Sequence, residues 1–224
     1  MKAISILFEN SEILLVNKEA GVSVQGGAGV SHPLDDELSA QLGYRVHLVH
    51  RLDKDTAGIL IVAKTSEAAA KWIKLVAGES VQKEYLAVCL GVPVIGGRQQ
   101  MSGVLEGIVE AHGRVQKAIT HFKVEKTGSV ALEGAGEIPL SLVRVTLGTG
   151  RMHQIRIQMA GAGAPLAADD QHGDFKKNKL IRKAGIRKLQ LAAVRLTVPL
   201  DGVQKSFEIP LPAHIQKTVD ACLS

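Results

Sequence analysis

Residues 50–58 read HRLDKDTAG and run directly into the apolar segment ILIVA at residues 59–63. A short apolar run that follows turn-forming and charged residues is typical of a buried strand. Most of the residues before it are ionisable: His50, Arg51, Asp53, Lys54 and Asp55. We therefore predict a buried strand at 59–63 with a polar, charged site at its beginning.

Other segments along the chain have the composition of strands, and residues 83–90 (KEYLAVCL) alternate as a half-buried strand does. Residues 91–107 contain repeated Pro and Gly signals and predict a hairpin or loop excursion. The remaining predicted strands lie at Ile13–Val16, Ala118–Val124, Leu140–Leu147 and Leu191–Val198, the last closed by Pro199.

Two segments predict helices. One begins after Thr65 or Ser66, either of which can cap it, and ends near Gly78. The other covers Arg151–Ala160, where Met152, Ile155 and Met159 form an apolar stripe. Because strands outnumber helices, the pattern predicts an α+β fold with a large mixed, mostly antiparallel sheet.

The composition narrows the class of protein. The chain has 224 residues, a net charge of +5 and only 3% aromatic residues. The basic balance favours a polyanionic partner, whereas the scarcity of aromatics argues against a sugar-stacking site. Two distant cysteines, the absence of a signal peptide at this N-terminus and the lack of an apolar run of about 20 residues predict a cytoplasmic protein.

Asp53 and Asp55 allow several interpretations when they are considered alone. A glycosidase carboxylate pair conflicts with the low aromatic content, and a phosphatase-type D-x-D motif would follow its strand rather than precede it. A metal pair lacks further acidic ligands, and His47 and His50 lack the partners that a metal site needs. We interpret Asp55 as a solvated turn residue.

Three other features have both a structural and a functional interpretation. Arg156 lies beside the apolar stripe of its predicted helix, so it either reaches water or pairs with a buried carboxylate, for which Asp53 is a candidate. Tyr85 fits ordinary core packing. Residues 176–188 (KKNKLIRKAGIRK) contain seven Lys or Arg and no acid, which fits a solvated face or a phosphate-binding segment.

These motifs together resemble one family. HRLDKDTAG at 50–58 is similar to the H-R-L-D-x-x-T-S-G signature of RluA-like pseudouridine synthases, and GRMHQIRIQ at 150–158 to their G-R-x-H-Q-I-R-x-H motif. KEYLAVCLG at 83–91 resembles K-x-Y-x-A-x-x-x-G, and ILLVNKEAG at 13–21 resembles V-V-N-K-P-x-G. The blocks occur in the order that the family has.

The resemblance implies a fold and a reaction. The fold would be a bent central sheet flanked by helices around an RNA-binding cleft, as one catalytic domain over residues 1–224. The reaction would isomerise uridine to pseudouridine in ribosomal or transfer RNA, without cofactor or metal. We expect RNA as the partner, no membrane association, and a monomer.

The resemblance also implies roles for residues. Asp53 matches the catalytic Asp, Tyr85 the Tyr that stacks on uracil, and Arg156 the Arg that pairs with the Asp. Arg51 matches the Arg that fills the space of the flipped base, and Leu191 a residue lining the uracil pocket. Further substrate or RNA contacts are expected at His50, Leu52, Thr56, Arg151, His153, Gln154, Lys176 and Lys177.

The chain departs from the family pattern at several positions: Glu19, Ala57, Met152, Gln158, Ala168, His172 and Ala192. None removes a residue of the expected catalytic set, so they bear on substrate choice and loop geometry. Two rival functions remain, an RNA-binding assembly factor on the same scaffold and a sugar hydrolase that uses Asp53 and Asp55. The first would tolerate loss of Asp53, whereas the second would need both acids.

Overall fold

The computed structural model describes residues 3–27, 29–78, 80–111, 114–132 and 136–223. The chain divides into two compact units. The first comprises Met1–Lys83 and Ala193–Pro210, and the second Glu84–Ala192 and Leu211–Ser224. Across the described helices, none is long and apolar enough to cross a membrane.

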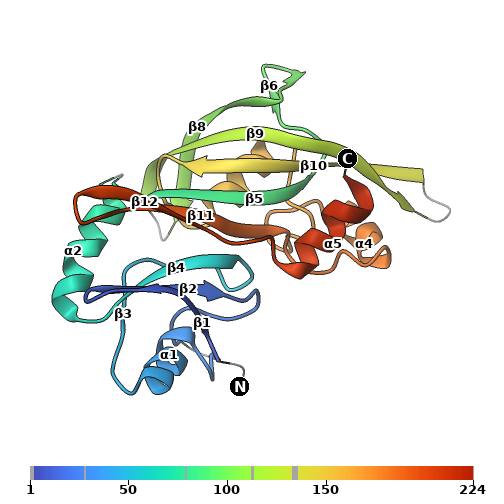
Figure 1. Ribbon diagram of the computed structural model, residues 1–224. Coiled ribbons are helices and arrows are strands. Elements are labelled where there is room, and N and C mark those ends of the chain that lie inside the picture. The colour runs from blue at the N-terminus through green and yellow to red at the C-terminus, as the bar shows by residue number, and fades with distance from the viewer. Residues whose placement is uncertain (1–2, 28, 79, 112–113, 133–135, 224) are drawn as a thin grey trace. The chain divides into compact units, whose positions relative to one another are not determined.

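The first unit is built on antiparallel pairs of strands (Figure 1). β1 (Ser5–Glu9) pairs with β2 (Ile13–Lys18), and β2 pairs with β4 (Ala57–Ala63). β4 also pairs with the short β3 (His47–Leu48) and neighbours β11 (Leu191–Leu200), which pairs with β12 (Val203–Glu208). The helices of this unit are α1 (Leu34–Leu42) and α2 (Ser66–Ala77).

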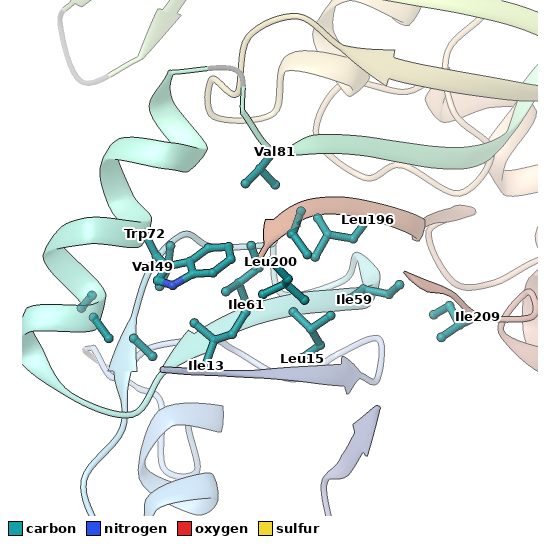
Figure 2. Close-up of a cluster of buried hydrophobic side chains, with 14 residues drawn as sticks. Ile13, Leu15, Val49, Ile59, Ile61, Trp72, Val81, Leu196, Leu200 and Ile209 are labelled. Carbon is teal, nitrogen blue, oxygen red and sulfur yellow. The ribbon is translucent and has the colours of Figure 1, made fainter. Parts of the chain in front are cut away.

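One apolar cluster joins the strands of the first unit to α2 (Figure 2). Ile13 and Leu15 of β2, Ile59 and Ile61 of β4 and Trp72 of α2 are at most 1% exposed. Every residue of β4 is buried, which is why the sequence shows a continuous apolar run there instead of an alternating pattern. The predicted buried strand at 59–63 is therefore confirmed, and it begins two residues earlier.

The predicted helix after Thr65 is also confirmed. The Thr65 hydroxyl accepts a hydrogen bond from the Ala68 N–H at 3.1 Å, and Gly78 follows the last helical residue. The cap satisfies one of the N–H groups that a helix start leaves without a partner. Trp72 lies on the buried side of this helix and donates from its indole nitrogen to Glu12 at 2.9 Å.

The second unit contains an antiparallel meander of long strands, in the order β5-β10-β9-β8. Its strands are β5 (Gln82–Leu90), which begins just before the unit boundary, β8 (Ser102–Ala111), β9 (Arg114–Leu132) and β10 (Gly136–Leu147). The pair β6 (Val94–Ile95) and β7 (Arg98–Gln99) forms a small hairpin. The helices are α3 (Gln154–Gly161), α4 (Phe175–Lys183) and α5 (Ala213–Cys222).

The structure corrects several predicted boundaries in this unit. β9 extends well beyond Ala118–Val124, and β8 occupies the end of the segment predicted as an excursion. The helix predicted from Arg151 begins at Gln154, because His153 adopts a left-handed conformation with φ 52°. Met152 is 40% exposed and lies outside the helix, so the predicted apolar stripe retains only Ile155 and Met159.

Candidate active site

Asp53 lies in a tight turn between β3 and β4 of the first unit. The Thr56 N–H donates to the Asp53 carbonyl at 3.1 Å, which closes the turn. Arg51, Lys54 and Asp55 are exposed, Asp53 is half-buried, and Leu52 and Thr56 are buried. The turn thus exposes Arg51, Lys54 and Asp55, whereas Asp53 is partly and Leu52 fully withdrawn from solvent.

Lys18 binds the backbone of this turn and of the segment that follows β2. The residue is 1% exposed, and its ammonium donates to the carbonyls of Val22 at 2.8 Å, Lys54 at 2.9 Å and Glu19 at 3.1 Å. Burial lowers the pKa of Lys18 to about 8, although nearby Asp55 and Asp53 oppose the shift. A buried cation therefore lies close to Asp53 and fixes the backbone next to it.

Gly58 fits the turn closely against β11. It has φ +120°, and a Cβ at this position would overlap the backbone of Ala193. Only glycine tolerates both that conformation and that approach. The last residue of the HRLDKDTAG motif is thus explained by its packing against the neighbouring strand.

His50 is neutral and contributes to the structure of the turn. Its Nε2 accepts a hydrogen bond from the Ile61 N–H at 3.2 Å. Burial and, to a lesser degree, Lys83 lower the pKa of His50 to about 3. The RNA contact expected of His50 stays a prediction, and the geometry already gives the ring a role in joining the turn to β4.

In the second unit, Arg156 on α3 binds Asp169 with two hydrogen bonds. Its Nε and Nη2 lie 2.7 Å from the two carboxylate oxygens, and both side chains are buried. Burial alone would raise the pKa of Asp169, but Arg156 and the N–H groups of Gln171 and His172 together lower it. The buried pair is ionised, and it fixes the plane of the guanidinium.

A pair of histidines links the same loop to the start of α3. Nδ1 of His153 lies 2.9 Å from Nε2 of His172, and the rings meet edge to face with centroids 5.0 Å apart. The Asp169–Gly173 loop is thereby held to α3 at two points. The loop backbone is held further by Asn178, which accepts from Ala168 N–H and donates to the Asp169 carbonyl.

Gln154 uses its amide within the protein. Its Nε2 donates to the Ile119 carbonyl and to Thr120 Oγ1, each at 2.9 Å, and its Oε1 accepts from Thr149 and from the Arg151 N–H. The residue is 2% exposed. These contacts give Gln154 a structural role, and its expected RNA contact stays a prediction.

The remaining predicted residues have clear positions. Tyr85 lies on β5 opposite Val145 of β10 and is buried, as is Leu191 at the start of β11. Arg151 is exposed and its Nε lies 3.4 Å from the Lys117 carbonyl. Asp53 belongs to the first unit and Arg156 to the second, so the pairing expected between them stays a prediction.

Within the described ranges, no group of three or more His, Cys, Asp or Glu could hold a metal ion.

A comparison with family models decides the class of protein. The model described as RNA pseudouridylate synthase matches residues 12–161, a stretch that includes the Asp53 turn and α3. The chain belongs to the RNA pseudouridylate synthase family. The resemblance to pseudouridine synthases is confirmed, and the chain is an isomerase of that class.

The sequence similarity to two relatives extends over almost the whole of this chain. The ribosomal large subunit pseudouridine synthase C of Salmonella typhi is 32% identical over 98% of this chain and 70% of its own length. The protein of the same name from Haemophilus ducreyi is 34% identical over 97% of this chain and 68% of its own.

Solved structures share the fold. Human RNA pseudouridylate synthase domain containing 1 aligns with a TM-score of 0.76 at 24% identity, covering 99% of this chain and 88% of that one. Human RNA pseudouridylate synthase domain containing 4 aligns with a TM-score of 0.75 at 22% identity, covering 96% and 91%. The predicted α+β pseudouridine synthase fold is therefore confirmed.

The structure explains two departures from the family motifs. Gln158 stands where the motif ends in His; its Oε1 accepts from Thr120 at 2.6 Å, and its Nε2 donates to the Leu105 and Ala118 carbonyls. Ala168 stands where the family has Gly and adopts φ 59°. In this pseudouridine synthase the loop contacts therefore hold an alanine in a conformation that glycine adopts more easily.

Two important residues were not singled out as site residues in the sequence. Lys18 lies inside the segment ILLVNKEAG at 13–21, and Asp169 directly follows Ala168. A lysine at the end of an apolar strand was the available signal for the first, because a buried lysine needs several acceptors. For Asp169 the signal was weaker, since nothing in the sequence distinguishes it from Asp170, which is exposed.

Proposed function

We propose that this chain converts uridine to pseudouridine in the RNA of the large ribosomal subunit, with Asp53 as the catalytic carboxylate. The observation that carries the proposal is the construction of the turn around Asp53. Lys18 and the Gly21 N–H both bind the Lys54 carbonyl, at 2.9 Å each, one residue after Asp53. The target RNA is inferred from the relatives, whose name specifies the large subunit.

The reaction needs an oriented, ionised carboxylate. The N1–C1′ bond of uridine breaks, the uracil turns, and C5 forms a bond to C1′; C5 then loses its proton and N1 gains one. A carboxylate can assist by attacking the sugar or the base, or by removing a proton on a glycal route. Each route requires the group to be ionised. The buried ammonium of Lys18 lies near Asp53, and the two side chains interact electrostatically.

The target nucleotide must leave its stack to reach a half-buried carboxylate, so base flipping is part of the proposal. Arg51 is exposed beside Asp53 and is the candidate to occupy the space that the base leaves. Tyr85 and Leu191 are the candidate residues that contact the uracil, since both are buried and present ring and alkyl surface.

Arg156 is proposed to orient Asp53 through a charged hydrogen bond. The support is local: Asp169 fixes the guanidinium plane, and α3 buries its stem. An arginine whose orientation is already fixed loses less side-chain entropy when it binds a further carboxylate. Asp169 would then be a positioning residue, which acts on the reaction through Arg156.

The test is release of tritium from RNA labelled at uridine C5, since bond formation at C5 expels that hydrogen. Transcripts of large-subunit RNA, small-subunit RNA and transfer RNA are compared under the same conditions. We expect release from the large-subunit transcript alone. Release from transfer RNA alone would overturn the substrate, and tight binding without release from any RNA would favour the assembly-factor alternative.

A further inference from the structure

The basic residues of helix α4 (Phe175–Lys183) lie on two different sides of the helix. Asn178 and Ile181 are buried and define its inner side. At 100° per residue, Lys176, Lys179 and Lys183 lie on the opposite side, and all three are exposed. Phe175, the first residue of the helix, lies next to Lys179 at the i, i+4 spacing. We call these four residues the outer face of α4.

The basic residues that flank the inner side already have acidic partners. Lys177 lies 3.5 Å from Asp174, and Arg182 forms an ion pair with Asp170. For Lys176, Lys179 and Lys183, the described part of the chain supplies no ion pair. The outer face therefore carries three positive charges that no acidic side chain neutralises. A polyanion that binds α4 is attracted more strongly to this face than to the side where Asp170 and Asp174 lie.

Phe175 makes this face unlike an ordinary solvated lysine face. The chain has four phenylalanines, and Phe175 is the one whose side chain is largely exposed, at 63%. Phe122 is buried, and Phe8 and Phe207 pack against the apolar cluster of the first unit. An exposed ring among unpaired lysines combines the two elements that bind single-stranded nucleic acid, a stacking platform and phosphate contacts.

We propose that the outer face of α4 is an RNA-docking surface, at which one unpaired base stacks on Phe175 and the flanking phosphates bind Lys176, Lys179 and Lys183. The inference rests on the proposed function in that the RNA is the substrate. The face is separate in sequence from the Asp53 and α3 motifs. Its contribution is affinity and choice of RNA segment.

The experiment compares two charge-matched triple variants. Lys176→Gln, Lys179→Gln and Lys183→Gln remove the outer-face charges, whereas Lys74→Gln, Lys126→Gln and Lys217→Gln remove three exposed lysines on other elements, for which the described residues likewise supply no ion pair. Affinity for the large-subunit transcript is measured between 50 and 300 mM salt. Because single-stranded phosphates contribute about 0.7 each to the salt slope, we expect the outer-face triple to lower the slope by about 2 and the control triple to leave it unchanged.

The stacking element has its own variants. Phe175→Leu keeps apolar bulk without the ring and is expected to weaken binding about ten-fold. Phe175→Tyr keeps the ring and is expected to bind as the wild type does. Thermal unfolding of each variant excludes loss of fold, since the exposed positions contribute little to the core.

The outcomes distinguish this proposal from the proposed function. The tritium-release rate at saturating RNA is expected to stay at the wild-type value in every outer-face variant, with the loss confined to affinity. Equal salt slopes in the two triples, or equal binding by the leucine and tyrosine variants, would overturn the docking surface. Absence of tritium release with the expected binding differences would overturn only the proposed reaction.

Discussion

Arg156 and Asp169 form a buried two-point ion pair, in which Nε and Nη2 each lie 2.7 Å from a carboxylate oxygen. The same carboxylate accepts the N–H groups of Gln171 and His172. One acidic side chain thus fixes both the arginine proposed to orient Asp53 and the loop that carries His172. This geometry predicts a loss of stability when Asp169 is changed and a dependence of stability on pH.

Asp169→Asn should be strongly destabilising, because it leaves the guanidinium buried against a neutral group. Loss of one partner of a buried pair costs about 3–5 kcal/mol. The folded pKa of Asp169 is lowered, so its stabilising contribution is present above the unfolded value and is lost as the pH falls through the folded value. Urea unfolding at pH 7 and below pH 4 measures both effects, with Asp170→Asn as the exposed control; equal losses in the two variants would contradict the buried pair.

Lys18→Met removes the hydrogen bonds that fix the turn, so the Asp53 carboxylate is no longer held in the orientation that the reaction needs. Because a small displacement of a catalytic group lowers the rate steeply, we expect the tritium-release rate to fall at least about ten-fold. Lys74→Met, an exposed lysine on α2, is the matched control and should keep full activity. Normal turnover by Lys18→Met would show that the ammonium does not hold the turn.

The same residue predicts a dependence of stability on pH. The folded pKa of Lys18 is about 8, below the unfolded value of about 10.4. The unfolded chain therefore holds more protons between these values, so the unfolding free energy of the wild type should rise with pH across that window relative to Lys18→Met. The unfolding free energy should change by a total on the order of 3 kcal/mol across this window. Below pH 8, Lys18 is charged in both states, and the full cost of burying its charge lowers the stability of the wild type. Parallel pH profiles of the two proteins would contradict a charged, buried Lys18.

Gly58→Ala should destabilise the first unit by more than about 3 kcal/mol, because the added Cβ overlaps the Ala193 backbone at a positive φ. Gly43 offers a control, since it has φ +77° with open space around its Cβ position. Gly43→Ala should cost only about 1 kcal/mol. The two urea midpoints give the comparison, and equal midpoints would mean that β11 does not approach the turn so closely.

His172→Phe should remove the hydrogen bond to His153 and lower stability by about 1 kcal/mol, the net value of a typical protein hydrogen bond. His172→Gln keeps a donor and an acceptor and should recover part of that loss. Thermal unfolding of both variants above pH 7 makes the comparison. If the phenylalanine variant is as stable as the wild type, the histidine contact contributes nothing.

The sequence predicted those elements whose stability is local or whose pattern is unambiguous. β4 was found because all of its residues are apolar, and α2 because Thr65 and Gly78 mark its ends. The start of α3 was misplaced because His153 is left-handed, a conformation set by the contacts of its loop rather than by its own preference. The length of β9 was missed because its exposed stretches read as loop, although they pair with β8 and β10.

The candidate site followed the same division. Residues inside contiguous motifs, such as Asp53 and Arg156, were predicted from their order in the chain. Lys18 and Asp169 were not, because their roles depend on carbonyls and side chains far apart in sequence: Lys18 reaches Lys54, and Asp169 reaches Arg156. The division of α4 into a neutralised and an unpaired side likewise required the positions of Asp170 and Asp174.

Single-turnover tritium release by Asp53→Asn beside Asp55→Asn is the most direct test of Asp53 as the catalytic carboxylate. The two residues share the turn, differ in burial and lose the same charge. We predict no release by Asp53→Asn with RNA affinity retained, and wild-type release by Asp55→Asn. Release by Asp53→Asn at the wild-type rate, or loss of release in both variants, would contradict a specific catalytic role for Asp53.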